Sequence, residues 1–93
     1  MVALLDEQQI RSRLDDLHGW TREGDVIRKT YTLDSFQEAI DFVNRIAERA
    51  EAANHHPDID IRYDRVACAL STHSEGGLTT KDFDLAGEID EVR

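Results

Sequence analysis

Residues 59–70 read IDIRYDRVACAL, and apolar side chains recur at every second position on both sides of the charged pair Asp64-Arg65. A period of two is typical of strands that bury one face. We therefore expect a β-hairpin, with strands over 59–63 and 66–71 and a tight turn at Asp64-Arg65. This turn lacks the glycine that two-residue hairpin loops favour, so its geometry stays open.

A long amphipathic helix precedes the hairpin. Ser35 followed by Glu38 is typical of a helix N-terminus. The helix should end near Ala53-Asn54, because Pro57 disfavours helical geometry at the residue before it. Its apolar face, expected to pack on the sheet, consists of Phe36, Ile40, Val43, Ala47 and Ala50.

The first third of the chain shows a similar pattern of one helix and two strands. Asp6 followed by Gln9 fits a capping box, and His18-Gly19 is expected to end the helix that begins there. Strands are expected over 20–22 and 26–33, joined by a turn that contains a glycine.

A last helix is expected after the flexible loop at Gly76-Gly77, with Thr79 as its cap. The order helix, two strands, helix, two strands, helix predicts an α+β two-layer sandwich, αββαββα, with a four-stranded antiparallel sheet and its helices on one face. Residues 1–93 suffice for a single domain and are too few for two. Because such a sheet leaves a face or an edge uncovered, we expect a homo-oligomer.

The composition argues against several classes of protein. The formal net charge is −9, from 20 acidic and 11 basic side chains, and no Lys/Arg cluster offers a local exception, so nucleic-acid binding is not expected. No apolar run approaches the roughly 20 residues that cross a bilayer. The opening MVALLDE lacks the features of a signal peptide, so we expect a cytoplasmic location. Cys68, within an apolar run, is expected to be a buried hydrophobe rather than a reactive thiol.

Three of the four histidines fall at the ends of predicted elements. His55 and His56 lie between the long helix and the third strand, and His73 lies just past the fourth strand. His56 and His73 are about equally far from the hairpin turn and should be near cross-strand partners. The hairpin would then place three imidazoles around one pocket. Histidine titrates nearest neutrality, so such a group can supply an acid and a base together.

Two carboxylates could set the tautomers of these imidazoles: Glu51, one helical turn before His55, and Asp82, in the first turn of the last helix. Histidines at element ends are often only solvated or capping residues. A zinc site is the main functional alternative, since histidines and a carboxylate can ligate zinc. However, adjacent His55 and His56 would point in different directions, which suits gripping a substrate better than converging on an ion.

The spacing of these residues resembles a known signature. Glu51-x-x-x-His55-His56-Pro57, followed by Tyr63, His73 and Asp82, is similar to the motif of the pterin-4a-carbinolamine dehydratases, and so is LSTHSEGGLT over 70–79. The resemblance covers nearly the whole chain. It implies loss of water from a 4a-hydroxytetrahydropterin to give quinonoid dihydropterin, in a dimer or tetramer, with no metal and no cofactor.

The resemblance also implies roles for individual residues. His55 and His73 would be the general acid and base, His56 would chiefly hold the substrate, and Glu51 and Asp82 would orient imidazoles. The segments that would line the pterin site include Asn54, Ser71, Thr72 and Ser74. One departure is Ile59, which stands where some family members carry an aromatic residue.

The same resemblance leaves one alternative open. The family also includes proteins that act as a dimerisation cofactor or assist assembly of a carbon-fixing enzyme, so a catalytically inactive binding or assembly module is possible. The intact set of three histidines favours catalysis, because a scaffold has no need of it.

Overall fold

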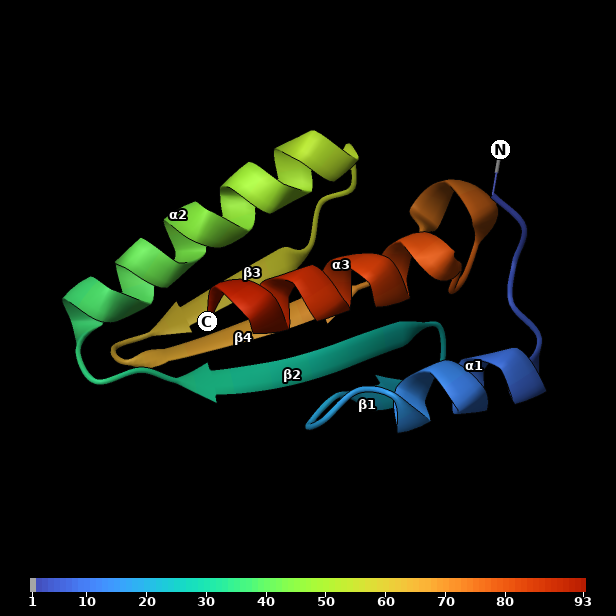
Figure 1. Cartoon of the computed structure of the whole chain (residues 1–93), viewed down its shortest axis with the longest axis horizontal. Helices are drawn as coiled ribbons and strands as arrows, with labels where there is room; N and C mark the ends of the chain where they lie inside the picture. The colour runs from blue at the N-terminus through green and yellow to red at the C-terminus, as the bar shows by residue number, and fades with distance from the viewer. Residues whose placement is uncertain (1) are drawn as a thin grey trace.

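The computed structural model describes residues 2–93, and this part of the chain folds into three α-helices and a four-stranded antiparallel sheet in the order αββαββα (Figure 1). The predicted α+β fold is thereby confirmed. Its elements are α1 (Glu7–Asp15), β1 (Thr21–Glu23), β2 (Val26–Thr32), α2 (Phe36–Ala53), β3 (Asp58–Arg62), β4 (Arg65–Leu70), the short 3-10 helix η1 (His73–Glu75) and α3 (Thr80–Val92). Within residues 2–93 no helix has the length and apolar character needed to cross a membrane.

The sheet has the order β1-β2-β4-β3, so β1 and β3 are its edges. Figure 1 shows the helices on one side of this sheet, with α3 lying over its middle and α1 beside β1. Burial alternates accordingly along the two central strands. The buried positions on the helix side are Ile27, Tyr31, Val66, Cys68 and Leu70. The expected two-layer arrangement therefore follows from the period of two in these strands.

Aromatic contacts join the sheet to the helical layer. The Tyr31 ring meets the Phe42 ring of α2 edge-on at 4.8 Å between centroids, and the Trp20 ring at 6.4 Å. Each fully buried large side chain of this kind contributes about 1.5–3 kcal/mol. Cys68 is buried beneath the helices, as expected, and its burial raises the pKa of the thiol to about 12.

The buried stripe of α2 differs from the predicted one. The side chains that α2 buries are Ala39, Phe42, Ile46 and Ala50. Of the predicted face only Ala50 is buried, whereas Phe36 is 50% exposed. The helix carries two apolar stripes, and the one with Phe42 packs inward because that ring fits against Tyr31.

The hairpin turn also lies one residue earlier than predicted. Arg62 pairs with Arg65, so the turn is Tyr63-Asp64, and both strands begin and end one residue sooner than expected. Tyr63 adopts the left-handed backbone conformation, φ 53°, which glycine takes more readily than any other residue. The Asp64 carbonyl accepts a 2.8 Å bond from Leu33 N–H, which ties the turn to the end of β2.

The first helix is shorter than predicted, because α1 ends at Asp15 rather than at His18-Gly19. The N–H groups of Asp16 and Leu17 bond to carbonyls only three residues back, so the helical ladder tightens and stops there. Gly19 then takes a left-handed conformation, φ 82°, and turns the chain into β1.

Candidate active site

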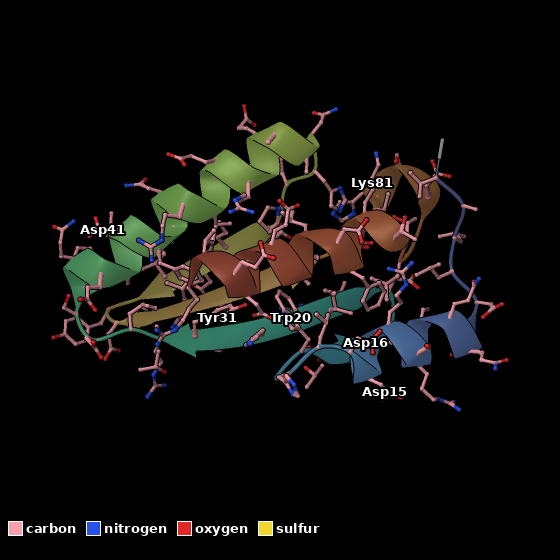
Figure 2. The ribbon with its side chains drawn as sticks, viewed as in Figure 1. Asp15, Asp16, Trp20, Tyr31, Asp41 and Lys81 are labelled. Atoms are coloured by element: carbon pink, nitrogen blue, oxygen red, sulfur yellow. The ribbon has the colours of Figure 1, made fainter. Side chains whose placement is uncertain are left out.

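An open pocket of about 360 Å³ lies where the end of α2, the loop after β4 and the start of α3 meet. Figure 2 shows Lys81 at the start of α3, toward the C-terminal end of α2. The residues that line the pocket are Asn54, His55, His56, Ser71, Thr72, His73, Ser74 and Lys81. The structure thus brings all three predicted histidines to one place, together with four of the other predicted site residues.

The end of α2 sets the direction of the first two histidines. Asn54 adopts the left-handed conformation, φ 50° and ψ 44°, which asparagine tolerates better than most residues. Its N–H bonds to carbonyls of the last helical turn, and the His55 N–H bonds to the Ala50 carbonyl at 3.1 Å. The chain therefore reverses sharply, and His55 and His56 leave the helix on the side of the pocket.

His55 is held by a buried carboxylate. Its Nε2 lies 2.6 Å from Oδ1 of Asp82, and the His55 side chain is 11% exposed whereas Asp82 is fully buried. The other carboxylate oxygen accepts bonds from Thr72 Oγ1 at 2.8 Å and from Thr79 N–H at 3.0 Å. Because a buried carboxylate is costly unless it is paired and hydrogen-bonded, these three donors hold Asp82 in one orientation.

His56 has a different partner from His55. Its Nε2 lies 2.5 Å from Oε2 of Glu51, and both side chains are well exposed. Water competes for such a contact, so we expect it to hold His56 only weakly. Glu51 precedes His55 by one helical turn, yet it contacts His56, so the two adjacent imidazoles turn toward different carboxylates.

His73 begins η1 and is exposed, and its ring makes no hydrogen bond to the residues that the structure describes. The loop that carries it is well bonded. Thr72 and Gly77 exchange backbone hydrogen bonds of 3.0 and 3.3 Å, and Gly76 takes a left-handed conformation between them. His73 therefore projects from a closed loop with both of its ring nitrogens free.

The predicted cross-strand pairing of His56 with His73 is wrong. β3 begins at Asp58 and β4 ends at Leu70, so neither histidine lies in the ladder. The hairpin register is also shifted, so His56 and His73 would not lie opposite each other even if both strands were longer. The contact that joins the two segments is the bonding of His55 and Thr72 to Asp82 of α3, which is a tertiary contact rather than a strand pair.

Two residues at this site were not expected from the sequence. Lys81 lines the pocket and adds a positive group to it. Thr79 was expected only as a helix cap, yet its hydroxyl also lies 2.8 Å from Thr72 Oγ1 behind the pocket wall. The sequence signal for Lys81 is its closeness to Asp82, and Thr79 also ends the stretch 70–79 that resembles the family.

Across residues 2–93, no three His, Cys, Asp or Glu side chains gather in a way that could hold a metal ion. In the pocket this follows from the divergence of His55 toward Asp82 and His56 toward Glu51. The arrangement leaves imidazoles facing a common space, where they can transfer protons to and from a bound molecule.

The family model and the curated relatives that the chain matches carry the same description. Residues 3–92 match the family model described as Pterin 4 alpha carbinolamine dehydratase. A curated protein of Roseiflexus castenholzii is 61% identical over 92 residues, which cover 99% of each chain. One of Mycobacteroides abscessus is 57% identical over 89 residues, covering 96% of this chain and 95% of the relative. Both names carry a provisional assignment as pterin-4-alpha-carbinolamine dehydratase.

Solved structures agree. A crystal structure described as a transcriptional coactivator/pterin dehydratase from Brucella melitensis superposes with a TM-score of 0.92, at 31% identity over 96% of this chain and 97% of that one. A pterin dehydratase-like protein described as a RuBisCO assembly factor in the alpha-carboxysome has a TM-score of 0.69 and 20% identity, over 81% of this chain and 89% of that one. This second likeness supports the fold alone.

Proposed function

This chain belongs to the pterin 4 alpha carbinolamine dehydratase family, and we propose that it is a hydro-lyase that converts a 4a-hydroxytetrahydropterin to quinonoid dihydropterin. The observation that carries the proposal is the pocket in which His55, His56 and His73 meet, with His55 held by buried Asp82. No cofactor is required by this chemistry, which consists of proton transfers and the loss of water.

The reaction needs an acid and a base on the same substrate. The bond between C4a and its hydroxyl oxygen breaks as that oxygen takes up a proton and leaves as water. The adjacent ring nitrogen loses its proton, and its electron pair forms the new C=N bond. Positioned acid and base groups of this kind each contribute about 10²–10⁴-fold to the rate.

We assign these roles from the way each imidazole is held. His73 has no protein partner in residues 2–93, so it is free to protonate the leaving hydroxyl. His55, oriented by Asp82, would accept the ring-nitrogen proton. His56 is exposed at the pocket edge and would chiefly hold the substrate. The polar edge of the pterin would bind among Asn54, Ser71, Thr72, Ser74 and Lys81.

The direct test follows the dehydration of freshly prepared 4a-hydroxytetrahydropterin by ultraviolet absorbance, with wild type beside His73→Ala. We expect the wild type to accelerate the reaction and the variant to lose most of that acceleration. A folded wild type that does not exceed the spontaneous rate would overturn the proposed activity.

A second candidate is a catalytically inactive binding or assembly module. It is favoured by the description of the Brucella melitensis structure, at 31% identity, as a transcriptional coactivator as well as a pterin dehydratase. We prefer catalysis because such a module would need neither the three pocket histidines nor a fully buried carboxylate beside one of them.

We also propose that the chain forms a homodimer or homotetramer. β3 is an edge strand, and large apolar side chains are exposed at the start of α2, at Phe36, and in the β3–β4 hairpin, at Ile61 and Tyr63. Such surfaces are commonly covered by a second subunit. Light scattering at micromolar concentration should give a mass above that of one chain, and a monomer would contradict this proposal.

A further inference from the structure

Behind the wall of the pocket lies a buried chain of hydrogen bonds that the proposed reaction does not use directly. Its members are the hydroxyls of Thr72 and Thr79 and the carboxylate of Asp82. Thr72 is 3% exposed and the other two are fully buried. Side chains so well shielded from water hold one hydrogen-bond pattern rather than exchanging among several.

The direction of these bonds follows from counting protons. Thr79 Oγ1 accepts from the backbone N–H of Lys81 at 3.2 Å, so its hydroxyl proton is free for Thr72 Oγ1 at 2.8 Å. Each hydroxyl has a single proton to donate. Thr72 accepts from Thr79 and therefore gives its own proton to Oδ2 of Asp82, also at 2.8 Å. The chain runs from Thr79 through Thr72 to Asp82.

Both bonds at Oδ2 are accepted by Asp82, and the direction of the bond at Oδ1 follows from the carboxylate itself. An ionised carboxylate can only accept, so Oδ1 of Asp82 requires the proton on Nε2 of His55, 2.6 Å away. Within residues 2–93 the other nitrogen, Nδ1, has no hydrogen-bond partner. Since no buried side-chain nitrogen or oxygen in residues 2–93 lacks a partner, Nδ1 must lie at the accessible surface, where His55 lines the pocket.

From this arrangement, and resting on the proposed function, we propose that Thr72 and Thr79 are positioning residues that hold His55 protonated at Nε2, and that Nδ1 is the atom through which His55 exchanges a proton with the pterin. Thr72 also closes the loop of His73, because its backbone bonds Gly77 across that loop. The two buried hydroxyls thus act on His55, through Asp82.

The tautomer can be measured without substrate. In protein with ¹⁵N-labelled histidine, long-range proton–nitrogen correlations distinguish a protonated Nε2 from a protonated Nδ1. We expect the uncharged imidazole of wild-type His55, observed near pH 7, to carry its proton on Nε2 and none on Nδ1. Thr79→Val removes the first donor and should give a mixture of tautomers, whereas Thr79→Ser should keep the wild-type pattern. Thr30→Val, at an exposed sheet position, is the matched control.

Kinetics then separates positioning from substrate binding. We expect Thr79→Val to lower kcat about 10-fold with KM changed less than about 2-fold, since proton transfer and not binding is impaired. Thr79→Ser should restore kcat to within about 2-fold. If loss of the helix cap unfolds Thr79→Val, Thr72→Val removes the donor to Asp82 without touching the cap, and its readout is the His55 tautomer, because Thr72 also lines the pocket.

The outcomes distinguish this inference from the proposed function. An active enzyme whose neutral His55 is protonated at Nδ1 would overturn the inference alone. So would an active Thr79→Val with unchanged tautomer and kcat. A folded wild type with the expected tautomer but no dehydration would overturn the proposed function, and with it the role given to Nδ1.

Discussion

The three pocket histidines differ in how their ring nitrogens are held. Nε2 of His55 contacts a buried carboxylate, and Nε2 of His56 contacts an exposed one. Neither ring nitrogen of His73 has a partner within residues 2–93. Substitutions at the three positions should therefore have different effects on stability and on the reaction.

His73→Ala should abolish most of the rate while leaving the free energy of unfolding nearly unchanged, because the exposed ring makes no hydrogen bond to any residue of the described range 2–93. His55→Ala should also lower turnover, and should cost about 1–3 kcal/mol of stability because buried Asp82 loses a donor. Turnover and chemical denaturation, measured on the same preparations, check both. Unfolding of His73→Ala would mean that this histidine is structural.

His56→Ala should mainly raise KM. The His56 ring lies at the pocket edge, and its contact with Glu51 is exposed, so removing it should cost the substrate a contact without disturbing the acid or the base. Steady-state kinetics separates the two constants. A collapsed kcat at an unchanged KM would assign His56 to the chemical step instead.

At the scale of elements, α2 shows how little an apolar pattern alone says about orientation. Both of its stripes have helical spacing, and the predicted one is only partly buried, with Phe36 half exposed and Val43 packed against the edge of the core. The choice between them was made by the partner surface, where the Tyr31 ring receives Phe42. The apolar pattern of the hairpin likewise did not determine its register, because a one-residue shift of the turn changes every cross-strand pair.

Two phenylalanines of α2 provide a matched test of this orientation. Phe42→Ala should lower the free energy of unfolding by about 3–5 kcal/mol, since its ring is fully buried. Phe36→Ala, at a position half exposed, should cost far less in folding and should instead weaken any oligomer that covers it. Denaturation and light scattering on the two variants measure these effects. Equal losses of folding stability would mean that both stripes are buried.

At the scale of the whole molecule, a second polar cluster lies away from the pocket and ties α3 to the sheet. Asp90 accepts hydrogen bonds from Lys29 at 2.8 Å, from Trp20 Nε1 at 3.2 Å and from the Tyr31 hydroxyl. Burial, and then the bond to Asp90, raises the pKa of Tyr31. The two ends of α3 are thus anchored by two carboxylates, Asp82 at the pocket and Asp90 at this cluster.

The raised pKa values of Tyr31 and Cys68 predict a loss of stability at alkaline pH. Below their ordinary pKa values both groups are protonated in the folded and the unfolded chain. Above pH 9.0, and up to about 12 for Cys68, the unfolded chain loses a proton that the folded chain keeps, so the free energy of unfolding falls as pH rises. Each group contributes at most about 1.4 kcal/mol per pH unit.

Chemical denaturation from about pH 8 upward should show this decline, with a smaller slope in Tyr31→Phe and in Cys68→Ala. The slope, unlike the absolute stability, is insensitive to the cavity that Cys68→Ala leaves. Identical slopes in all three proteins would show that neither group is responsible.

The amino-acid sequence by itself determined the element order, the α+β class, the burial of Cys68 and the position of His55, His56 and His73 at the end of α2 and past β4. These follow from local spacing and from caps such as Ser35 and Thr79, which act within a few residues. A cytoplasmic location and the catalytic roles stay predictions. Only the tertiary structure decided which stripe of α2 is buried, where the hairpin turns, and that Thr79 and Lys81 belong to the site. Those features depend on contacts between residues far apart in the chain, whose energies no local pattern contains.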